Sequence, residues 1–293
     1  MLLPQKLQEE YPFEPNWFLQ KDGLNLHYID DGPQNGYPTF FLHGNPTWSF
    51  FYRKLILSLK TTLRCIAPDH LGCGLSDKPQ TGKFSYNLLT HSENFKALID
   101  KLAIKKFNLV VHDWGGAIGL TALKDDFHKI NKLVLLNTAA FPSKQVPKRI
   151  KFCRLPWIGE FFVRALNGFA RPATKMATEK GLSPLIKSGF LYPYKNWNER
   201  VAVWNFVKDI PLESNHPTLP LLKETSNSLG KLSKVPVIAC WGMQDFCFHS
   251  GFLREWETRL PQMKTYEFNS AGHYLLEDEF EKCSTVIDEF LVS

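Results

Sequence analysis

The chain lacks the sequence features of several common protein classes. No apolar run approaches the ~18 residues that a membrane-spanning helix needs, so no transmembrane segment is expected. Residues 1–15 hold no basic start followed by an apolar stretch, which predicts no secretory signal and a cytoplasmic location. The six cysteines form no CxxC pair and are interpreted as reduced thiols. They occupy positions 65, 73, 153, 240, 247 and 283.

The sequence also has little excess charge. Its 35 basic and 29 acidic side chains give a formal net charge of +6, and the basic residues are scattered apart from one run between Lys144 and Arg154. Because no RNP-like aromatic set or long basic tail accompanies that run, we interpret it as a solvated surface and predict no nucleic-acid partner. No glycine-rich dinucleotide fingerprint follows a strand and no His/Cys cluster has ligand spacing, so we predict no organic cofactor and no metal.

What the sequence does contain is an alternation of short apolar runs and longer helical patterns. With 293 residues and 44% hydrophobic side chains, the chain suits one large domain or one domain with an insertion. The alternation is typical of an α/β protein with a mostly parallel sheet and helices on both faces. Asp22 and Gly23, between the first two runs, predict an opening antiparallel hairpin. Strands are predicted at 17–20, 24–28, 39–42, 64–67, 107–112, 132–137, 235–241 and 265–268.

This alternation breaks between Asn137 and Val235. The residues there carry helical patterns, prolines and many aromatic side chains, but no convincing strand. The simplest interpretation is a helical insertion that packs over the ends of the strands. We therefore expect a core domain formed by residues 1–139 and 213–293 and a helical cap domain formed by residues 140–212.

The most informative stretch is the apolar strand at 107–112, which is followed by Asp113, Trp114 and two glycines. A strand, a sharp turn and a helix in this order are typical of a nucleophile elbow, in which the glycines let the helix start close to the strand. The apex residue is Asp113, where serine is commoner, and Val111 stands where a small residue is usual. Taken alone, Asp113 also fits a helix N-cap, because aspartate is a favoured capping residue.

A carboxylate at that apex favours one type of chemistry. Asp113 is ionised at neutral pH and attacks an electrophilic sp3 carbon without first losing a proton. The product is an alkyl ester, which water hydrolyses at its carbonyl carbon, whereas a serine would give a stable ether. The pattern therefore indicates displacement at carbon rather than ordinary acyl transfer.

A second motif is the glycine loop that follows the strand at 39–42 and contains Asn45. Pro46 holds Asn45 in an extended conformation, and the backbone N–H groups of Asn45 and Trp114 are expected to form an oxyanion hole. The Asn45 amide and the Trp114 indole are uncharged donors, which suit a departing anion that must later leave. The alternatives are a loop-stabilising Asn45 and a Trp114 that only packs in the core. His43 is interpreted as structural.

Two further motifs, Asp245 and His273, each follow a predicted strand near the C-terminus. Both lie at the carboxyl edge of the sheet, where ligand sites form, and the chain order is nucleophile, acid, histidine. We expect His273 to take a proton from the attacking water and Asp245 to orient its ring. His112 and His249 are rivals to His273, but His112 should face away from Asp113 because strand side chains alternate.

The four motifs together resemble those of haloalkane dehalogenases, a branch of the α/β-hydrolase superfamily. The similar stretches read HGNPTW, HDWGG, WGMQD and GHY, at 43–48, 112–116, 241–245 and 272–274. The third dehalogenase subfamily and the β-lactone decarboxylases of bacterial long-chain olefin synthesis share further similar stretches with the chain, at 68–79, 136–142 and 164–171. The resemblance covers almost the whole chain and implies an α/β-hydrolase fold, with an eight-stranded sheet and a helical cap.

The resemblance also implies a role for each motif. Asp113 would be the nucleophile, His273 the general base and Asp245 the catalytic acid. Asn45 and Trp114 would bind the halide or another leaving group. One dehalogenase subfamily carries its acid after the preceding core strand, where this chain has no acidic residue, so Asp245 is the only candidate.

Haloalkane hydrolysis through a covalent aspartyl ester, giving an alcohol and a halide ion, is the first activity that the resemblance implies. The alternative is β-lactone decarboxylation to a long-chain cis-alkene and CO2, because a β-lactone also offers an electrophilic sp3 carbon. Epoxide hydrolysis, for which Tyr192 and Tyr194 would supply protons, and a non-catalytic binding protein on the same scaffold are less favoured.

The aromatic residues of the insertion predict an apolar pocket for a hydrophobic small-molecule substrate. Phe141, Phe169 and Phe246 are expected to line part of it. The resemblance further implies a homo-oligomer or a multienzyme assembly.

Overall fold

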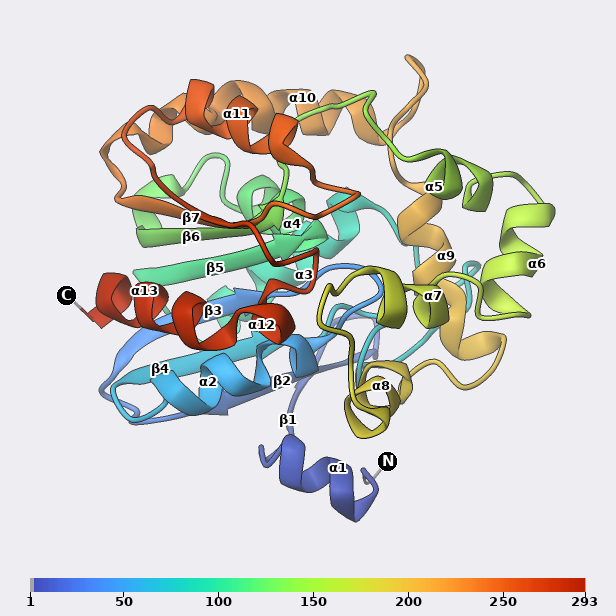
Figure 1. Ribbon diagram of the computed structural model, residues 1–293, viewed down its shortest axis with the longest axis horizontal. Coiled ribbons are helices and arrows are strands. Elements are labelled where there is room, and N and C mark those ends of the chain that lie inside the picture. Colours follow the sequence, from blue (N-terminus) through green and yellow to red (C-terminus); the bar gives the residue numbers. More distant parts are fainter. Residues whose placement is uncertain (1–2, 293) are drawn as a thin grey trace.

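A computed structural model, which describes residues 3–292, shows an eight-stranded sheet between two layers of helices (Figure 1). The strand order is β1-β2-β4-β3-β5-β6-β7-β8; β2 is antiparallel to β1 and β4, and all other neighbours are parallel. The predicted mostly parallel sheet is confirmed. The strands are β1 (Asn16–Leu19), β2 (Asn25–Asp31), β3 (Tyr37–Leu42), β4 (Leu63–Pro68), β5 (Phe107–Asp113), β6 (Ile130–Thr138), β7 (Val237–Gly242) and β8 (Lys264–Phe268).

Every predicted strand is present, and the differences lie at the strand ends. The opening hairpin forms as expected, with Gly23 in the left-handed region at φ 81°. β7 starts two residues later than predicted, at Val237, because Pro236 has no N–H to donate to a neighbouring strand. β6 is longer than predicted at both ends, so that its last residue, Thr138, pairs with Asp113 of β5.

The two faces of the sheet are covered by different helices. Along β5, Leu109 and Val111 belong to one hydrophobic cluster and Val110 to another, because successive strand side chains point to opposite faces. The first cluster includes side chains of α3 (Leu88–Lys101), α4 (Trp114–Ala122), α10 (Thr218–Ser228) and α11 (Ser250–Arg259). The second includes side chains of α2 (Arg53–Leu59), α12 (Leu275–Asp278) and α13 (Phe280–Val292).

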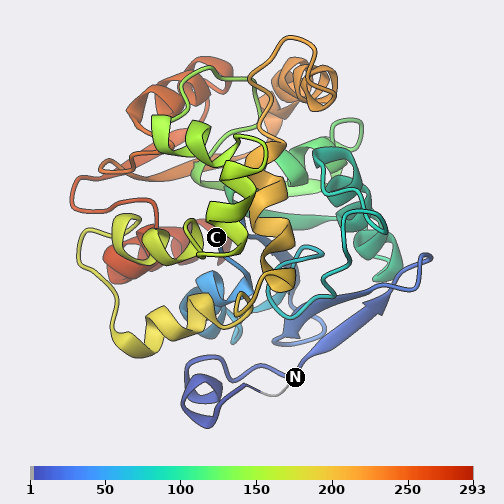
Figure 2. The same cartoon turned by 90° about the vertical axis from the view of Figure 1, so that its right-hand side faces the viewer.

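Between β6 and β7 the chain forms a layer of short helices over the carboxyl ends of the strands (Figures 1 and 2). A third hydrophobic cluster, which includes Ile150, Val163, Val203 and Trp204, lies among these helices. This layer is therefore positioned to close the edge of the sheet where the predicted site residues lie. Its helices are α5 (Lys148–Cys153), α6 (Ile158–Arg164), α7 (Ala170–Met176), α8 (Pro184–Leu191) and α9 (Val201–Lys208).

The remaining helical segments are short. They are α1 (Gln5–Glu10) and the 3₁₀ segments η1 (Ser49–Tyr52), η2 (Phe127–Lys129), η3 (Asn198–Arg200) and η4 (Leu229–Lys234). Among residues 3–292, no helix has the length and hydropathy needed to cross a membrane. All six cysteines are free thiols, and five of them are buried.

Candidate active site

Asp113 stands at the sharp turn between β5 and α4. Its φ of 52° lies in the left-handed region, which a residue with a side chain enters only at a cost in conformational energy. A Cβ atom added at Gly115 would collide with the Leu42 carbonyl, and one added at Gly44 would collide with the Asp113 carboxyl. These two glycines therefore let strand, loop and helix approach closely enough to hold the Asp113 side chain at the edge of the sheet.

The Asp113 carboxyl makes no N-cap hydrogen bond to α4, so capping does not explain its position. Oδ1 instead accepts a hydrogen bond from the backbone N–H of Asn45 at 2.7 Å, and the backbone N–H of Trp114 also stabilises the carboxylate. Burial raises the pKa of Asp113 above its ordinary value, and the nearby His273 and the two N–H groups offset only part of that effect. Both N–H groups expected to form an oxyanion hole thus act on the carboxyl group of the nucleophile candidate, and that of Asn45 donates to Oδ1.

The other Asp113 oxygen faces His273, which lies between two carboxylates. The distance from His273 Nε2 to Asp113 Oδ2 is 3.7 Å, and that from His273 Nδ1 to Asp245 Oδ2 is 2.7 Å. Burial opposes a charge on the imidazole, but the two carboxylates outweigh it and raise the pKa of His273 above its ordinary value. With Nδ1–H donated to Asp245, Nε2 is the nitrogen that faces the cavity and Asp113, as a general base requires.

Buried contacts position the loops that carry Asp245 and His273. The Asn137 side chain at the end of β6 accepts from the Gly242 N–H at 2.8 Å and donates to the Gly242 carbonyl at 3.0 Å, which joins β6 to the strand end before Asp245. His112 donates through Nε2 to the His273 carbonyl at 2.9 Å, and its ring stacks on Phe51 at 4.2 Å. His112 thus lies on the opposite face of β5 from Asp113, as predicted, and holds the His273 backbone.

Asn45 and Trp114, the predicted donors for the leaving group, both line the cavity in front of Asp113. The Asn45 amide donates one hydrogen to the carbonyl of Val203 in α9 at 3.1 Å, which leaves its second N–H for a ligand. Asn45 Oδ1 is buried and has no hydrogen-bond partner within residues 3–292. The Trp114 ring packs against Phe206, with centroids 5.4 Å apart.

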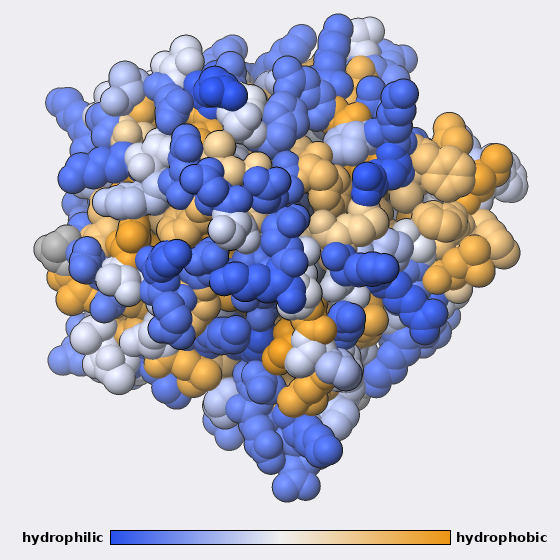
Figure 3. All heavy atoms as spheres, in the orientation of Figure 1, coloured by the Kyte–Doolittle hydropathy of each residue, from blue (hydrophilic) through white to orange (hydrophobic). Residues whose placement is uncertain are grey.

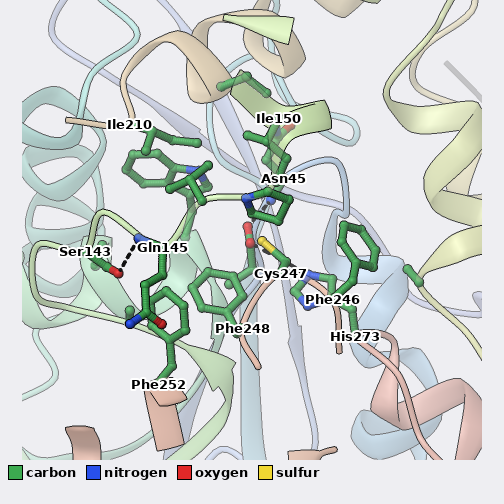
Figure 4. Close-up of a pocket in the computed structure, with 18 of the residues that line it drawn as sticks. Asn45, Ser143, Gln145, Ile150, Ile210, Phe246, Cys247, Phe248, Phe252 and His273 are labelled. Carbon is green, nitrogen blue, oxygen red and sulfur yellow. Dashed lines mark hydrogen bonds and ion pairs between the residues drawn. The ribbon is translucent and has the colours of Figure 1, made fainter. Parts of the chain in front are cut away.

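The cavity has a volume of about 140 Å³ and a largely apolar wall (Figure 4). Asp113 and His273 lie in that wall, and the three predicted pocket residues, Phe141, Phe169 and Phe246, also line it. Further apolar side chains come from the helical layer between β6 and β7 and from α10 and α11, namely Val146, Ile150, Ala173, Val207, Ile210, Leu222 and Phe252. Such a lining suits a hydrophobic substrate and strengthens electrostatic interactions at Asp113.

Sequence reasoning missed two cavity residues that follow Asp245. The Phe248 ring stacks on the His273 ring, with centroids 5.7 Å apart and planes 15° from parallel. The Cys247 N–H donates to Asp245 Oδ1 at 2.7 Å, and burial and the two nearby carboxylates keep the pKa of the Cys247 thiol well above its ordinary value. The apolar run around Phe246 was the available signal, but only the loop conformation shows which ring contacts His273.

The other histidines considered have structural contacts. His43 donates through Nδ1 to the Gly44 carbonyl and accepts the His70 N–H at Nε2, so both ring nitrogens are used. His249 accepts the Gly251 N–H at the start of α11.

The two tyrosines considered for epoxide chemistry lie elsewhere. The Tyr194 hydroxyl is 3.3 Å from the Thr47 carbonyl, and neither Tyr192 nor Tyr194 is among the described residues that line the catalytic cavity. The structure therefore gives the epoxide hydrolysis hypothesis no proton donor at the expected place.

The fold and the site together define an α/β hydrolase. The sheet has eight strands and is mostly parallel, the acidic nucleophile candidate stands at a strand–helix elbow, and Asp245 and His273 come after it along the chain. A family model described as "alpha/beta hydrolase fold" matches residues 37–280, and the chain belongs to this family.

Within the family, the chain is similar to two kinds of enzyme. It is 40% identical to the cis-3-alkyl-4-alkyloxetan-2-one decarboxylase of Shewanella oneidensis over 96% of this chain and 89% of that protein. It is 29% identical to haloalkane dehalogenase 2 of Mycobacterium tuberculosis over 95% of each. The crystal structure of a haloalkane dehalogenase from Bradyrhizobium elkani superposes with a TM-score of 0.87 at 22% identity, covering 95% of this chain and 97% of the other, which shows the shared fold.

Proposed function

We propose that this protein is a β-lactone decarboxylase that converts cis-3,4-dialkyl oxetan-2-ones into cis-alkenes and CO2. The observation that carries the proposal is the Asp113 carboxylate, with Oδ1 held by the Asn45 N–H and Oδ2 facing an apolar cavity. The 40% identity to a decarboxylase of this kind, against 29% to a dehalogenase, favours the decarboxylation hypothesis over dehalogenation, which the sequence analysis placed first.

The reaction needs two steps at Asp113. In the first, Oδ2 attacks C4 of the lactone from the side opposite the ring oxygen; the C4–O bond breaks and its electrons leave on the new carboxylate. In the second, the bond between C3 and that carboxylate breaks and CO2 departs. The electrons of that broken bond form the C3=C4 double bond, while the C4–O bond to Asp113 breaks and its electrons restore the aspartate. Inversion at C4 followed by an anti elimination keeps the two alkyl groups cis.

The surrounding residues have roles that follow from their positions. Asn45 Nδ2 and the Trp114 indole hold the carboxylate that ring opening creates. His273, as an imidazolium paired with Asp245, stabilises the Asp113 carboxylate when it leaves in the second step. Neither step consumes water. The apolar wall of the cavity keeps water away from the ester and so protects it from hydrolysis.

We further propose that residues 140–212 act as a cap domain that binds the alkyl chains, above a core of residues 1–139 and 213–293. A cavity of about 140 Å³ is small for a ring with two alkyl groups. A second, almost wholly apolar cavity of about 440 Å³ lies beside it, and Ile150, Phe169, Ala173 and Phe246 line both. One alkyl chain would extend across these shared side chains into the larger cavity.

Haloalkane dehalogenation is the second candidate, because the same geometry supports it. His273 Nε2 lies where a general base for ester hydrolysis must lie, 3.7 Å from Asp113 Oδ2. Formation of the alkyl ester neutralises Asp113, one of the two carboxylates that raise the pKa of His273. The imidazole then loses its proton more easily and becomes able to activate water.

A side-by-side assay in H2¹⁸O distinguishes the two reactions. With a cis-dialkyl β-lactone we expect alkene and CO2 in equal amounts and no ¹⁸O in Asp113, because the aspartate is restored without water. With a 1-bromoalkane of equal length, each turnover would place solvent oxygen in the Asp113 carboxyl group. Gas chromatography and peptide mass spectrometry measure both. Release of halide and alcohol at a higher kcat/KM than that for alkene release would overturn the decarboxylase proposal.

Replacing Trp114 by phenylalanine tests the leaving-group site. The loss of one uncharged donor should lower kcat for the lactone by about 10²-fold, a typical effect of removing one preorganised hydrogen bond. It should also abolish the quenching of tryptophan fluorescence by bromide. Trp17→Phe, at an exposed position in β1, is the matched control and should keep both properties. Unchanged bromide quenching in Trp114→Phe would remove the indole from the anion site.

A further inference from the structure

The outer surface of the helical layer carries an unusual concentration of exposed apolar side chains. Six of the fourteen large hydrophobic side chains exposed among residues 3–292 fall within the fifteen residues from 152 to 166. Figure 3 shows hydrophobic residues gathered at the right-hand end of the molecule, where α6 lies in Figure 1. We call this surface the apolar tip; its members are Phe152, Leu155, Trp157, Ile158, Phe161 and Leu166.

Trp157, at the turn between α5 and α6, is the most exposed member of the tip. Its side chain is 86% exposed, and its φ of 64° lies in the left-handed region that disfavours residues with a side chain. The fold thus accepts a conformational cost at a position where the indole ring protrudes into solvent. Core packing explains neither feature.

Positive charge surrounds the apolar tip. Residues 140–178 contain eight basic side chains and one acidic one, a net charge of +7, whereas the whole chain carries +6. The single acid, Glu160, is already paired with Arg164. Lys148 and Lys151 of α5 are exposed and form no ion pair with any residue in 3–292. The basic run interpreted from the sequence as an ordinary solvated surface therefore borders exposed apolar side chains, and the segment 140–178 that contains it accounts for the positive charge of the protein.

The apolar tip also adjoins the route to the catalytic site. Phe152, which is 43% exposed, lines the 440 Å³ cavity, as does Phe162 of α6, and the two rings meet edge to face at 5.5 Å. On its inner side this cavity shares Phe169 and Phe246 with the catalytic cavity. Two adjoining apolar cavities that share lining side chains thus lie between the tip and Asp113.

We infer that the apolar tip docks on the surface of an anionic phospholipid bilayer and that the 440 Å³ cavity passes alkyl chains between the bilayer and the catalytic cavity. Amphipathic surfaces with aromatic and aliphatic side chains bordered by lysines bind the interface of such membranes without crossing them. A second copy of the chain is a poorer occupant, because joining two tips would bring together two copies of the segment 140–178, whose formal net charge is +7. The docking proposal depends only on the exposed side chains and charge of the tip, whereas the passage of substrate also depends on the proposed decarboxylase activity.

Vesicle flotation tests the docking. The full chain should float with vesicles of phosphatidylcholine and phosphatidylglycerol at 3:1 and much less with phosphatidylcholine alone, and 0.5 M salt should release it. We expect Trp157→Ser/Ile158→Ser and Lys148→Glu/Lys151→Glu each to lower the apparent affinity at least about tenfold. The matched control, Leu19→Ser/Leu89→Ser, removes two exposed apolar side chains far from the tip and should bind like the wild type.

Activity in the same samples separates docking from catalysis. Trp157→Ser/Ile158→Ser should turn over a short-chain β-lactone in buffer at the wild-type rate but a long-chain β-lactone held in vesicles at least about tenfold more slowly. Binding to anionic vesicles without lactone turnover would support the docking and overturn the passage of substrate. Equal flotation with neutral and anionic vesicles, or no flotation, would overturn the docking. So would a tip variant that changes only the oligomeric state measured by sedimentation velocity.

Discussion

Replacing Asp113 by asparagine should reduce alkene formation from a β-lactone by at least about 10⁴-fold, as expected when the nucleophile is lost. The amide oxygen keeps the hydrogen bond that Oδ1 accepts from the Asn45 N–H, so the local geometry should survive. What the variant loses is the charged oxygen that attacks carbon. Gas chromatography of the alkene measures the effect.

The stability of this variant provides its control. The pKa of Asp113 is raised by burial, so the ionised carboxyl destabilises the folded state at every pH above the pKa of an unfolded aspartate. The amide that replaces it carries no such charge, so the melting temperature of Asp113→Asn at pH 7 should equal or exceed that of the wild type. The two melting temperatures should converge as the pH falls below about 4, where an unfolded aspartate is also protonated. A well-folded variant with wild-type turnover would exclude Asp113 as the nucleophile.

Replacing His273 by phenylalanine should affect the two proposed reactions of Asp113 differently. With a 1-bromoalkane, alkylation still proceeds, but no base activates water, so the intact protein should gain the mass of one alkyl group and stop. With a β-lactone, elimination needs neither water nor a base. Alkene release should continue at a rate lowered by about 10²-fold, because the imidazolium no longer stabilises the departing Asp113 carboxylate.

Mass spectrometry of the intact protein and gas chromatography follow the two outcomes. His128→Phe is the matched control, because His128 is an exposed histidine in η2 outside the site, and it should behave like the wild type with both substrates. Normal alcohol release by His273→Phe would show that another group hydrolyses the ester. Complete loss of alkene release would show that His273 takes a direct part in elimination.

The fold was predictable because its central strands are buried on both faces. Such strands appear in the sequence as short, nearly continuous apolar runs, and all eight predicted runs form strands. Their ends were less predictable, since they depend on the neighbouring strand: β6 extends to Thr138 because that residue pairs with Asp113. Asp113 ends β5, Asp245 and His273 follow β7 and β8, and the order of these strands in the sheet brings the three residues together.

The four motifs could not distinguish the two activities, because dehalogenation and lactone decarboxylation are both proposed to begin with the same attack by Asp113. The motifs placed dehalogenation first, whereas similarity over the whole chain favours decarboxylation. The residues that distinguish the two substrates are therefore expected in the helical layer rather than in the four motifs. Phe248, which stacks on His273, and Cys247 show how much of the pocket depends on loop conformation.

The sequence by itself determined the layered architecture, the apolar character of the site and the types of group that carry its chemistry, since these follow from local patterns and from side-chain chemistry. Only the tertiary structure decided which oxygen of Asp113 faces His273, that His273 lies between two carboxylates, and that two adjoining apolar cavities lie between the site and an exposed tip. Each of these depends on contacts between distant parts of the chain, such as that between Asn45 and Val203, 158 positions apart. Local sequence patterns carry no information about such contacts.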